Sequence, residues 1–155
     1  MRFNLSTCYG MQIILYLARS NKIVSSAELS ESLQISQRYI LQIARKLRDG
    51  EMIDTHIGMS GGYTLKKEAS TVSVYDMVSL LEGEMHIPSC IIKYKNDTLH
   101  TTLSMSKKYI DTFFSSITLD QLLFACAEEQ FLKIIRLAET HIGILENEKS
   151  NNKLC

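Results

Sequence analysis

The chain contains little proline and glycine and has no long apolar run. Its 155 residues include one proline and seven glycines, which argues against a disordered or fibrous protein. It has no stretch of about 18 uncharged apolar residues, and no apolar run follows a basic start at the N-terminus. We therefore expect a cytoplasmic protein without a membrane span or signal peptide. Because 45% of its residues are hydrophobic, the chain can bury a core of its own.

Cysteine and histidine pairs at metal-binding spacing are also missing. The four cysteines are Cys8, Cys90, Cys126 and Cys155, and the sequence has no C-x-x-C or H-x-x-x-H pair. An intracellular chain of this length needs no disulfides, so we expect free thiols. No nucleophile stands beside a general base, which argues against an enzyme.

The net charge is zero, but the two halves of the chain differ in charge. Residues 1–67 carry nine Lys/Arg and five Asp/Glu, for a net charge of +4. Residues 68–155 carry eight and twelve, for a net charge of −4. A basic half joined to an acidic half is typical of a DNA-binding module followed by an oligomerisation or sensing part. Ordinary fluctuation in charge is the alternative interpretation.

Hydrophobic periodicity predicts a mainly α protein with a small β-hairpin wing. Apolar residues recur at i, i+3, i+4 and i+7 in several segments, which is typical of amphipathic helices. Two strand-like segments, 52–57 and 63–65, flank the glycine-rich turn 58–62, which predicts a hairpin. The predicted helices cover residues 5–19, 26–33, 37–49, 71–81 and 101–116, with a last helix from 118 or 120 to about 147.

Serines and a glycine mark the predicted helix ends. Ser25 or Ser26 is placed to cap the second helix, Ser36 the third and Ser73 the fourth. Gly50 follows the third helix, where a left-handed C′ residue is expected.

The order of these elements is the plan of a winged helix-turn-helix domain. Two helices joined by a tight turn precede a longer, polar-faced helix, and a glycine-tipped hairpin follows. The start of that longer helix can present side chains to base edges in the major groove of double-stranded DNA. The candidates for base contact are Ser36, Gln37, Arg38, Tyr39 and Gln42.

Further candidates for DNA contact lie around this helix. Arg45, Lys46 and Arg48 follow along it and are better placed for phosphates, which position a protein without specifying sequence. Ser26 opens the preceding helix and completes this group. In the wing, the candidates are His56, Ser60, Gly61 and Gly62.

Several short stretches match a known family of regulators. They are Met1-Arg2, Tyr9-Gly10, Ile35-Ser36, Tyr39-Ile40-Leu41-Gln42, Leu47-Arg48-Asp49-Gly50, Gly61-Gly62-Tyr63-Thr64-Leu65, Val74-Tyr75-Asp76-Met77-Val78, Leu81-Glu82-Gly83 and Ile117-Thr118-Leu119. Through them, residues 1 to about 122 resemble the Rrf2 (Rrf-two) family of winged-helix transcription regulators. The resemblance implies a homodimer that pairs through its fifth helix and binds a pseudo-palindromic site. Leu103, Ile110, Phe113 and Phe114 are the candidates for the dimer contact.

The resemblance also bears on sensing, because cluster-binding members carry three cysteines in the loop before the dimer helix. Here only Cys90 stands at such a position, so the three-cysteine motif is lacking. The resemblance places Asp97 near the third cysteine position and His100 at a histidine ligand of IscR-like members. It places Cys8 where NsrR-like members supply a ligand from the first helix.

Three interpretations of these four residues stay open. The site is lost and the cysteines are ordinary thiols, or Cys90, with or without Cys8, is a redox sensor. In the third interpretation, an iron–sulfur cluster or metal is held by mixed ligands, although two thiolates are few for a cluster. We expect no cofactor, and the sequence does not identify a metal.

The wing departs from the family pattern at its first glycine. Cluster-type members often carry an arginine directly before this glycine, which suits minor-groove insertion. In this chain Ile57 precedes Gly58, which argues against minor-groove readout by the wing.

The sequence thus predicts a sequence-specific DNA-binding regulator that acts as a homodimeric repressor, and a response to a redox signal or effector through the Cys90 loop is one of the open interpretations. The alternative is a regulator that acts mainly through a protein partner, as CymR-like members do, but the basic third helix favours DNA. We expect a DNA-binding domain over 1–83, a sensor loop over 84–100, dimerisation and C-terminal helices over 101–148, and a frayed tail over 149–155.

Overall fold

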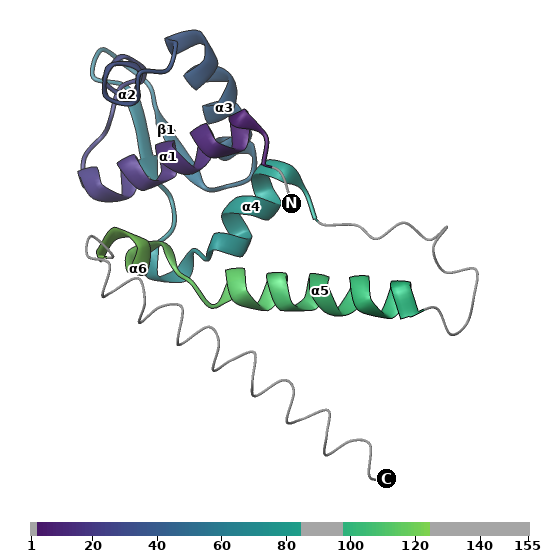
Figure 1. Ribbon diagram of the computed structural model, residues 1–155. Helices are drawn as coiled ribbons and strands as arrows, with labels where there is room; N and C mark the ends of the chain where they lie inside the picture. Colours follow the sequence, from purple (N-terminus) through teal and green to yellow (C-terminus); the bar gives the residue numbers. More distant parts are fainter. Residues whose placement is uncertain (1–2, 85–97, 125–155) are drawn as a thin grey trace.

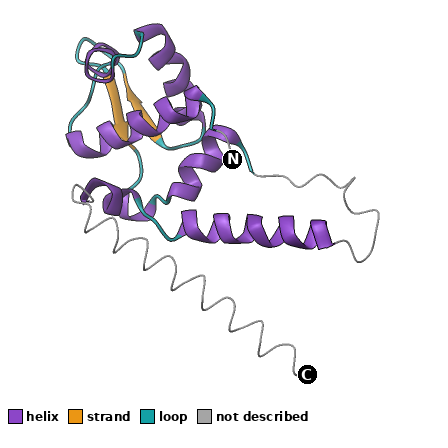
Figure 2. Ribbon diagram, in the orientation of Figure 1, coloured by secondary structure: helices purple, strands orange, loops and turns teal. Residues whose placement is uncertain are grey.

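Short helices and a hairpin surround one hydrophobic core, and a longer helix extends beyond it (Figure 1). The computed structural model describes residues 3–84 and 98–124. The elements are α1 (Leu5–Ser20), α2 (Ser26–Leu33), α3 (Gln37–Asp49), β1 (Ile53–His56), β2 (Gly62–Leu65), the 3-10 turn η1 (Ala69–Thr71), α4 (Val74–Glu82), α5 (Thr98–Ser115) and α6 (Leu119–Phe124). The predicted fold class, mainly α with a β-hairpin wing, is confirmed, and Figure 2 shows the two strands beside the helices.

A tight turn joins α2 to α3. The Ser25 hydroxyl caps α2 by accepting the Glu28 backbone N–H at 3.1 Å, so the first of the two predicted caps is the one used. Gln34 ends α2 in the left-handed conformation, with φ 55°. The Ser30 hydroxyl then donates to the Ile35 carbonyl at 2.7 Å, and Ile35 is buried. These contacts fix the angle at which α3 leaves α2.

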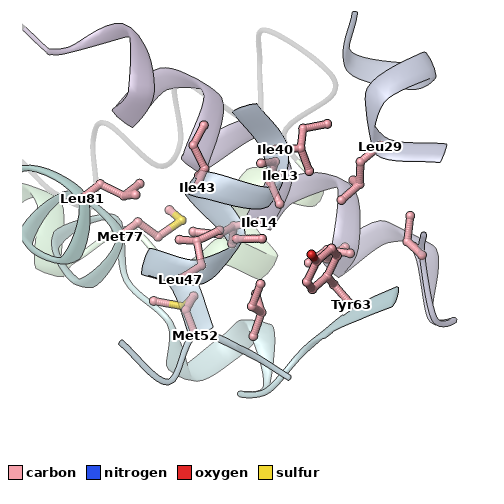
Figure 3. Packing of buried hydrophobic residues seen from close by; sticks show 14 of the residues in the cluster. Ile13, Ile14, Leu29, Ile40, Ile43, Leu47, Met52, Tyr63, Met77 and Leu81 are labelled. Carbon is pink, nitrogen blue, oxygen red and sulfur yellow. The ribbon is translucent and has the colours of Figure 1, made fainter. Parts of the chain in front are cut away.

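The core forms where one face each of α1, α2, α3 and α4 meets the hairpin (Figure 3). Ile40, Ile43, Ala44 and Leu47 lie on the inner face of α3 at helical spacing, and all four are buried. Their neighbours include Ile13, Ile14 and Leu17 of α1, Leu29 of α2, Met52, Ile53, Tyr63, and Met77 and Leu81 of α4. This burial fixes the rotation of α3 about its axis.

The hairpin is anchored to the core at its base. β1 and β2 pair antiparallel, with Ile53 opposite Leu65 and His56 opposite Gly62. Val24 forms an isolated bridge to Tyr63, through N–H···O bonds of 3.0 and 2.9 Å. The segment before α2 therefore holds the wing against the helix-turn-helix.

The end of the described chain returns to the same core. A capping box between Ser73 and Asp76 opens α4, as the sequence predicted for Ser73. Ser73 also bridges to Thr118, which brings Leu119 at the start of α6 into the core with no exposed surface. The segment linking α5 to α6 is thereby tied to the winged-helix part.

Several predicted boundaries are wrong by a few residues. The first strand spans 53–56 rather than 52–57, because Met52 is buried and Ile57 points into solvent. The helix predicted from residue 71 begins at Val74, after the separate turn η1. The helix predicted from residue 101 begins at Thr98, so residues 98–100 belong to α5 and not to the loop. Its first turn is rich in threonine and histidine, which carry little helical signal in sequence.

The predicted left-handed glycine after α3 is also wrong. Gly50 has φ −88°, and the left-handed residue is Glu51, with φ 56°. Gly50 instead provides space, because a Cβ there would lie 2.0 Å from the Leu80 Cδ1 atom.

Parts of other predictions lie outside the described residues. They are most of the loop (85–97), the last helix beyond Phe124 and the tail 149–155. None of the described helices is long and apolar enough to span a membrane.

We expect truncation of a buried leucine on α3 to unfold the protein more easily than truncation of an exposed one. Leu47→Ala removes a fully buried side chain and should lower the free energy of unfolding by about 2–5 kcal/mol. Leu41→Ala, on the same helix but 50% exposed, should lower it by less than about 1 kcal/mol. Urea unfolding followed by circular dichroism measures both, and equal losses would contradict this packing of α3.

Candidate nucleic-acid interface

The outer face of α3 carries side chains free to meet a ligand. Arg38, Gln42 and Arg45 are exposed and lie at i, i+4 and i+7, on the side opposite the buried face. Neither arginine forms a salt bridge within residues 3–84 and 98–124. Guanidinium and amide groups are those that bond to guanine and adenine edges in the major groove.

The first turn of α3 is open to an acceptor. Ser36 occupies the N-cap position as predicted, but its hydroxyl makes no capping hydrogen bond. The Gln37 amide donates to the Ser26 hydroxyl at 2.8 Å, which joins the starts of α3 and α2. The structure therefore brings these three predicted residues together at one end of the helix-turn-helix, where backbone N–H groups favour an anion such as phosphate.

Two of the predicted contact residues turn toward the protein instead. The Tyr39 ring is half-buried and packs edge-on against Tyr9 of α1, with ring centroids 5.8 Å apart. The Lys46 ammonium donates to the Leu81 carbonyl at 2.7 Å, in the last turn of α4. That turn has carbonyls without helical partners, so a cation there stabilises the helix end. Lys46 thus joins α3 to α4, and Arg45 is the better candidate for phosphate.

A shallow groove separates α3 from the hairpin. Leu41, Arg45 and Arg48 of α3 line it, together with Thr55 and Tyr63 of the strands. Arg48 is paired with Asp49 at 2.7 Å, and both side chains are half-exposed, so water or phosphate can compete for the arginine. Burial raises the pKa of the Tyr63 phenol, against a smaller opposing effect of Arg48, so the phenol stays neutral.

The wing residues divide into exposed and internal positions. Ser60 is exposed at the tip. His56 is half-buried, and its Nε2 lies 2.9 Å from the Thr64 hydroxyl across the hairpin. A Cβ on Gly62 would lie 2.3 Å from the Val24 carbonyl oxygen, so this glycine allows close packing within the protein rather than close approach to DNA. Gly61 closes the turn by donating its N–H to the Gly58 carbonyl at 3.0 Å.

The predicted dimer residues of α5 lie in two environments. Ile110 and Phe114 line a cavity of about 200 Å³ against α4, with Phe3, Tyr75 and Val78. Phe113 packs on Phe114, with ring centroids 6.0 Å apart. Leu103 lies further toward the N-terminus of α5 and is 37% exposed. Ile110 and Phe114 therefore contribute to packing within the chain, which their apolar character alone did not reveal.

Hydrogen bonds join the start of α1 to the end of α4 close to this cavity. The Asn4 backbone N–H and side-chain amide donate to the two Glu82 carboxylate oxygens at 2.6 and 2.8 Å. The backbone hydrogen bond from Asn4 lowers the pKa of Glu82, so the carboxylate is ionised at neutral pH. This contact fixes the start of α1 beside the end of α4.

The predicted sensor residues are only partly described. Cys8 lies half-buried on α1 as a free thiol, and His100 lies half-buried near the start of α5. Cys90 and Asp97 lie outside the described residues. Within the described part, no three His, Cys, Asp or Glu side chains are close enough to hold a metal ion. The mixed-ligand site, which would also need Cys90 and Asp97, stays a prediction.

Leu41 is a further candidate for DNA contact that the sequence analysis did not name. Leu41 is half-exposed and lines the groove toward the hairpin together with Arg45. Its spacing of three residues from Arg38 was the available signal, since i and i+3 share a helix face. Apolar side chains at such positions can contact thymine methyl groups.

A helix-turn-helix with a polar outer face and a hairpin wing defines the winged-helix class of DNA-binding proteins. The family model Rrf2, described as "Iron-dependent Transcriptional regulator", matches residues 3–125. The chain belongs to the Rrf2 family and is a DNA-binding transcription regulator rather than an enzyme.

Known proteins resemble the chain at low sequence identity. A putative HTH-type transcriptional regulator, YffB of Lactococcus lactis, is 34% identical over 80 residues, which are 50% of this chain and 51% of that protein. The regulator NsrR of Bacillus licheniformis is 22% identical over 118 residues, covering 75% of this chain and 82% of that protein.

Solved structures share the fold. The structure of CymR, the global cysteine regulator of B. subtilis, has a TM-score of 0.70 at 20% identity and covers 79% of this chain and 96% of its own. IscR of T. potens has a TM-score of 0.68 at 26% identity and covers 84% and 91%.

The contrast between Arg45 and Lys46 predicts different effects on DNA binding. Arg45→Ala should reduce the slope of log affinity against log salt by about one, because one phosphate contact is lost. Lys46→Ala should leave this slope unchanged and lower the free energy of unfolding, because α3 loses its bond to α4. Fluorescence anisotropy on a random-sequence duplex, at several salt concentrations, measures the slopes. A reduced slope for Lys46→Ala would show that Lys46 contacts a DNA phosphate.

Proposed function

We propose that the chain acts as a homodimeric repressor that reads a pseudo-palindromic operator through α3. The N-terminal half of α3 enters the major groove, with Arg38 and Gln42 on base edges and Arg45 on a phosphate. A polar cluster formed by Ser26, Ser36 and Gln37 contacts the DNA backbone beside this groove. Occupancy of the operator then blocks transcription.

The observation that carries this proposal is the division of α3 into two faces. Four apolar side chains on one face are buried in the core, so the face with Arg38, Gln42 and Arg45 is held outward. A helix held in this way offers its polar face as a rigid surface that fits the major groove. The flanking hairpin and the open first turn of α3 add contacts to the DNA backbone on either side of the groove.

The dimer proposal rests on the exposed half of α5. None of the 18 residues of this helix is buried within the described chain. Its first half extends away from the other described elements (Figure 1) and carries Leu103 and Met105, both more than a third exposed. A helix that leaves apolar side chains in water is stabilised by a partner. A second copy would place two α3 helices on one side of a duplex.

Signal response stays a prediction of the sequence. A redox response through Cys90, with or without Cys8, depends on a loop that lies outside the described residues. Action through a protein partner likewise stays an alternative. Neither affects the assignment of α3 to DNA.

Selection of duplexes by the full-length protein from a random library tests sequence-specific binding. We expect one enriched motif with two related halves. Arg38→Ala should lower affinity for the enriched duplex about 10–100-fold, while affinity for a scrambled duplex falls much less. Arg19→Ala, at an exposed position in the last turn of α1, is the matched control and should leave the ratio of the two affinities unchanged.

Two results would contradict the proposal. Failure of the folded wild-type protein to enrich any motif would remove sequence-specific binding. An equal loss of affinity for both duplexes in Arg38→Ala would show that this arginine contacts phosphate and does not read a base.

A further inference from the structure

The hairpin tip carries the two most exposed large apolar side chains of the described residues. Ile57 is 98% exposed and Met59 is 108% exposed on the relative scale, so neither packs on the fold. Met59 is at a corner of the turn that the Gly61 N–H closes on the Gly58 carbonyl. Turn corners commonly hold polar residues or glycine, and here an unbranched apolar side chain stands at the outermost point.

The backbone presents these side chains at a defined place. Gly58 has φ 125°, a conformation that residues with a Cβ rarely adopt. A Cβ on Gly61 would lie 2.6 Å from the His56 carbonyl oxygen. At the root of the turn, His56 contacts the Thr64 hydroxyl. The tip is therefore a turn of defined shape, which depends on Gly58 and Gly61.

The surroundings of the tip suit a polyanion. No Asp or Glu occurs from Thr55 to Leu65. Arg45 and Arg48 line the groove between α3 and the hairpin, with Thr55 on its other wall. The tip and the start of α3 lie at the same end of the molecule, away from α5 (Figures 1 and 2). The apolar tip thus lies beyond a groove lined by two arginines, at the end of the molecule that carries the start of α3.

We propose that Ile57 and Met59 form an apolar wedge that enters the minor groove beside the half-site read by α3 and bends the duplex. This inference rests on the proposed function. Aliphatic side chains in the minor groove partly unstack a base step, and burial of their surface offsets the cost of unstacking. Pyrimidine–purine steps such as TA and CA/TG unstack most easily, so these steps should recur at the position facing the wing. The wedge provides contact without the arginine that the wing lacks.

The double variant Ile57→Ser/Met59→Ser tests the wedge. Both positions are exposed, so the urea midpoint should be unchanged. On the duplex recovered by selection, affinity should fall about tenfold or more, because apolar burial is lost. The salt slope should stay the same, because no phosphate contact is removed. Energy transfer between labels at the two ends of the duplex should report less bending than with the wild-type protein. A 2-aminopurine base at the wedged step should no longer become more fluorescent when the protein binds.

Leu5→Ser is the matched control, since Leu5 is an exposed aliphatic residue on α1, away from the hairpin. It should leave affinity and bending unchanged. A double variant that binds and bends the duplex like wild type would overturn the wedge and leave the proposed function standing. If that variant also sediments as a lighter species, the tip belongs to a contact between copies of this chain. If wild type recovers no duplex, both the wedge and the proposed function fail.

Discussion

Burial of the inner face of α3 is the constraint on which the rest of the interface depends. Ile40, Ile43, Ala44 and Leu47 lock this helix against α1, the hairpin and α4. Successive helical residues are about 100° apart around the axis, so fixing one face fixes the direction of all the others. Arg38, Gln42 and Arg45 therefore point outward because of the core, and packing inside the protein sets the direction of the side chains proposed to contact DNA.

The positions of the other predicted contact residues follow from the fixed orientation of α3. Lys46 lies one residue from Arg45 and for that reason faces α4, where it bonds to the Leu81 carbonyl. The wing is held by the bridge between Val24 and Tyr63, so its tip stands at a set distance from α3. Through α4 the same core reaches the cavity beside α5, where Ile110 and Phe114 pack. α4 therefore lies between α5 and α3 and contacts both of them.

Local features of the sequence predicted much of this arrangement. The repeat of apolar residues placed α3 over residues 37–49, and turn glycines between two strand-like segments placed the hairpin. Contacts between distant residues were not predictable, because periodicity identifies a buried face without naming its neighbour. Tyr39 against Tyr9 and Lys46 against α4 are both of this kind. The start of α5 was also missed, since its polar first turn has no apolar stripe.

In the proposed complex, two copies of the α3 surface contact one duplex. Hydroxyl-radical footprinting of the full-length protein on a selected duplex tests this arrangement. We expect two protected stretches related by two-fold symmetry, with centres about 10 base pairs or a multiple of this distance apart. Leu103→Glu, which places a charge on the exposed half of α5, should weaken both stretches together. A single protected stretch at saturating protein would show that only one α3 surface contacts the duplex.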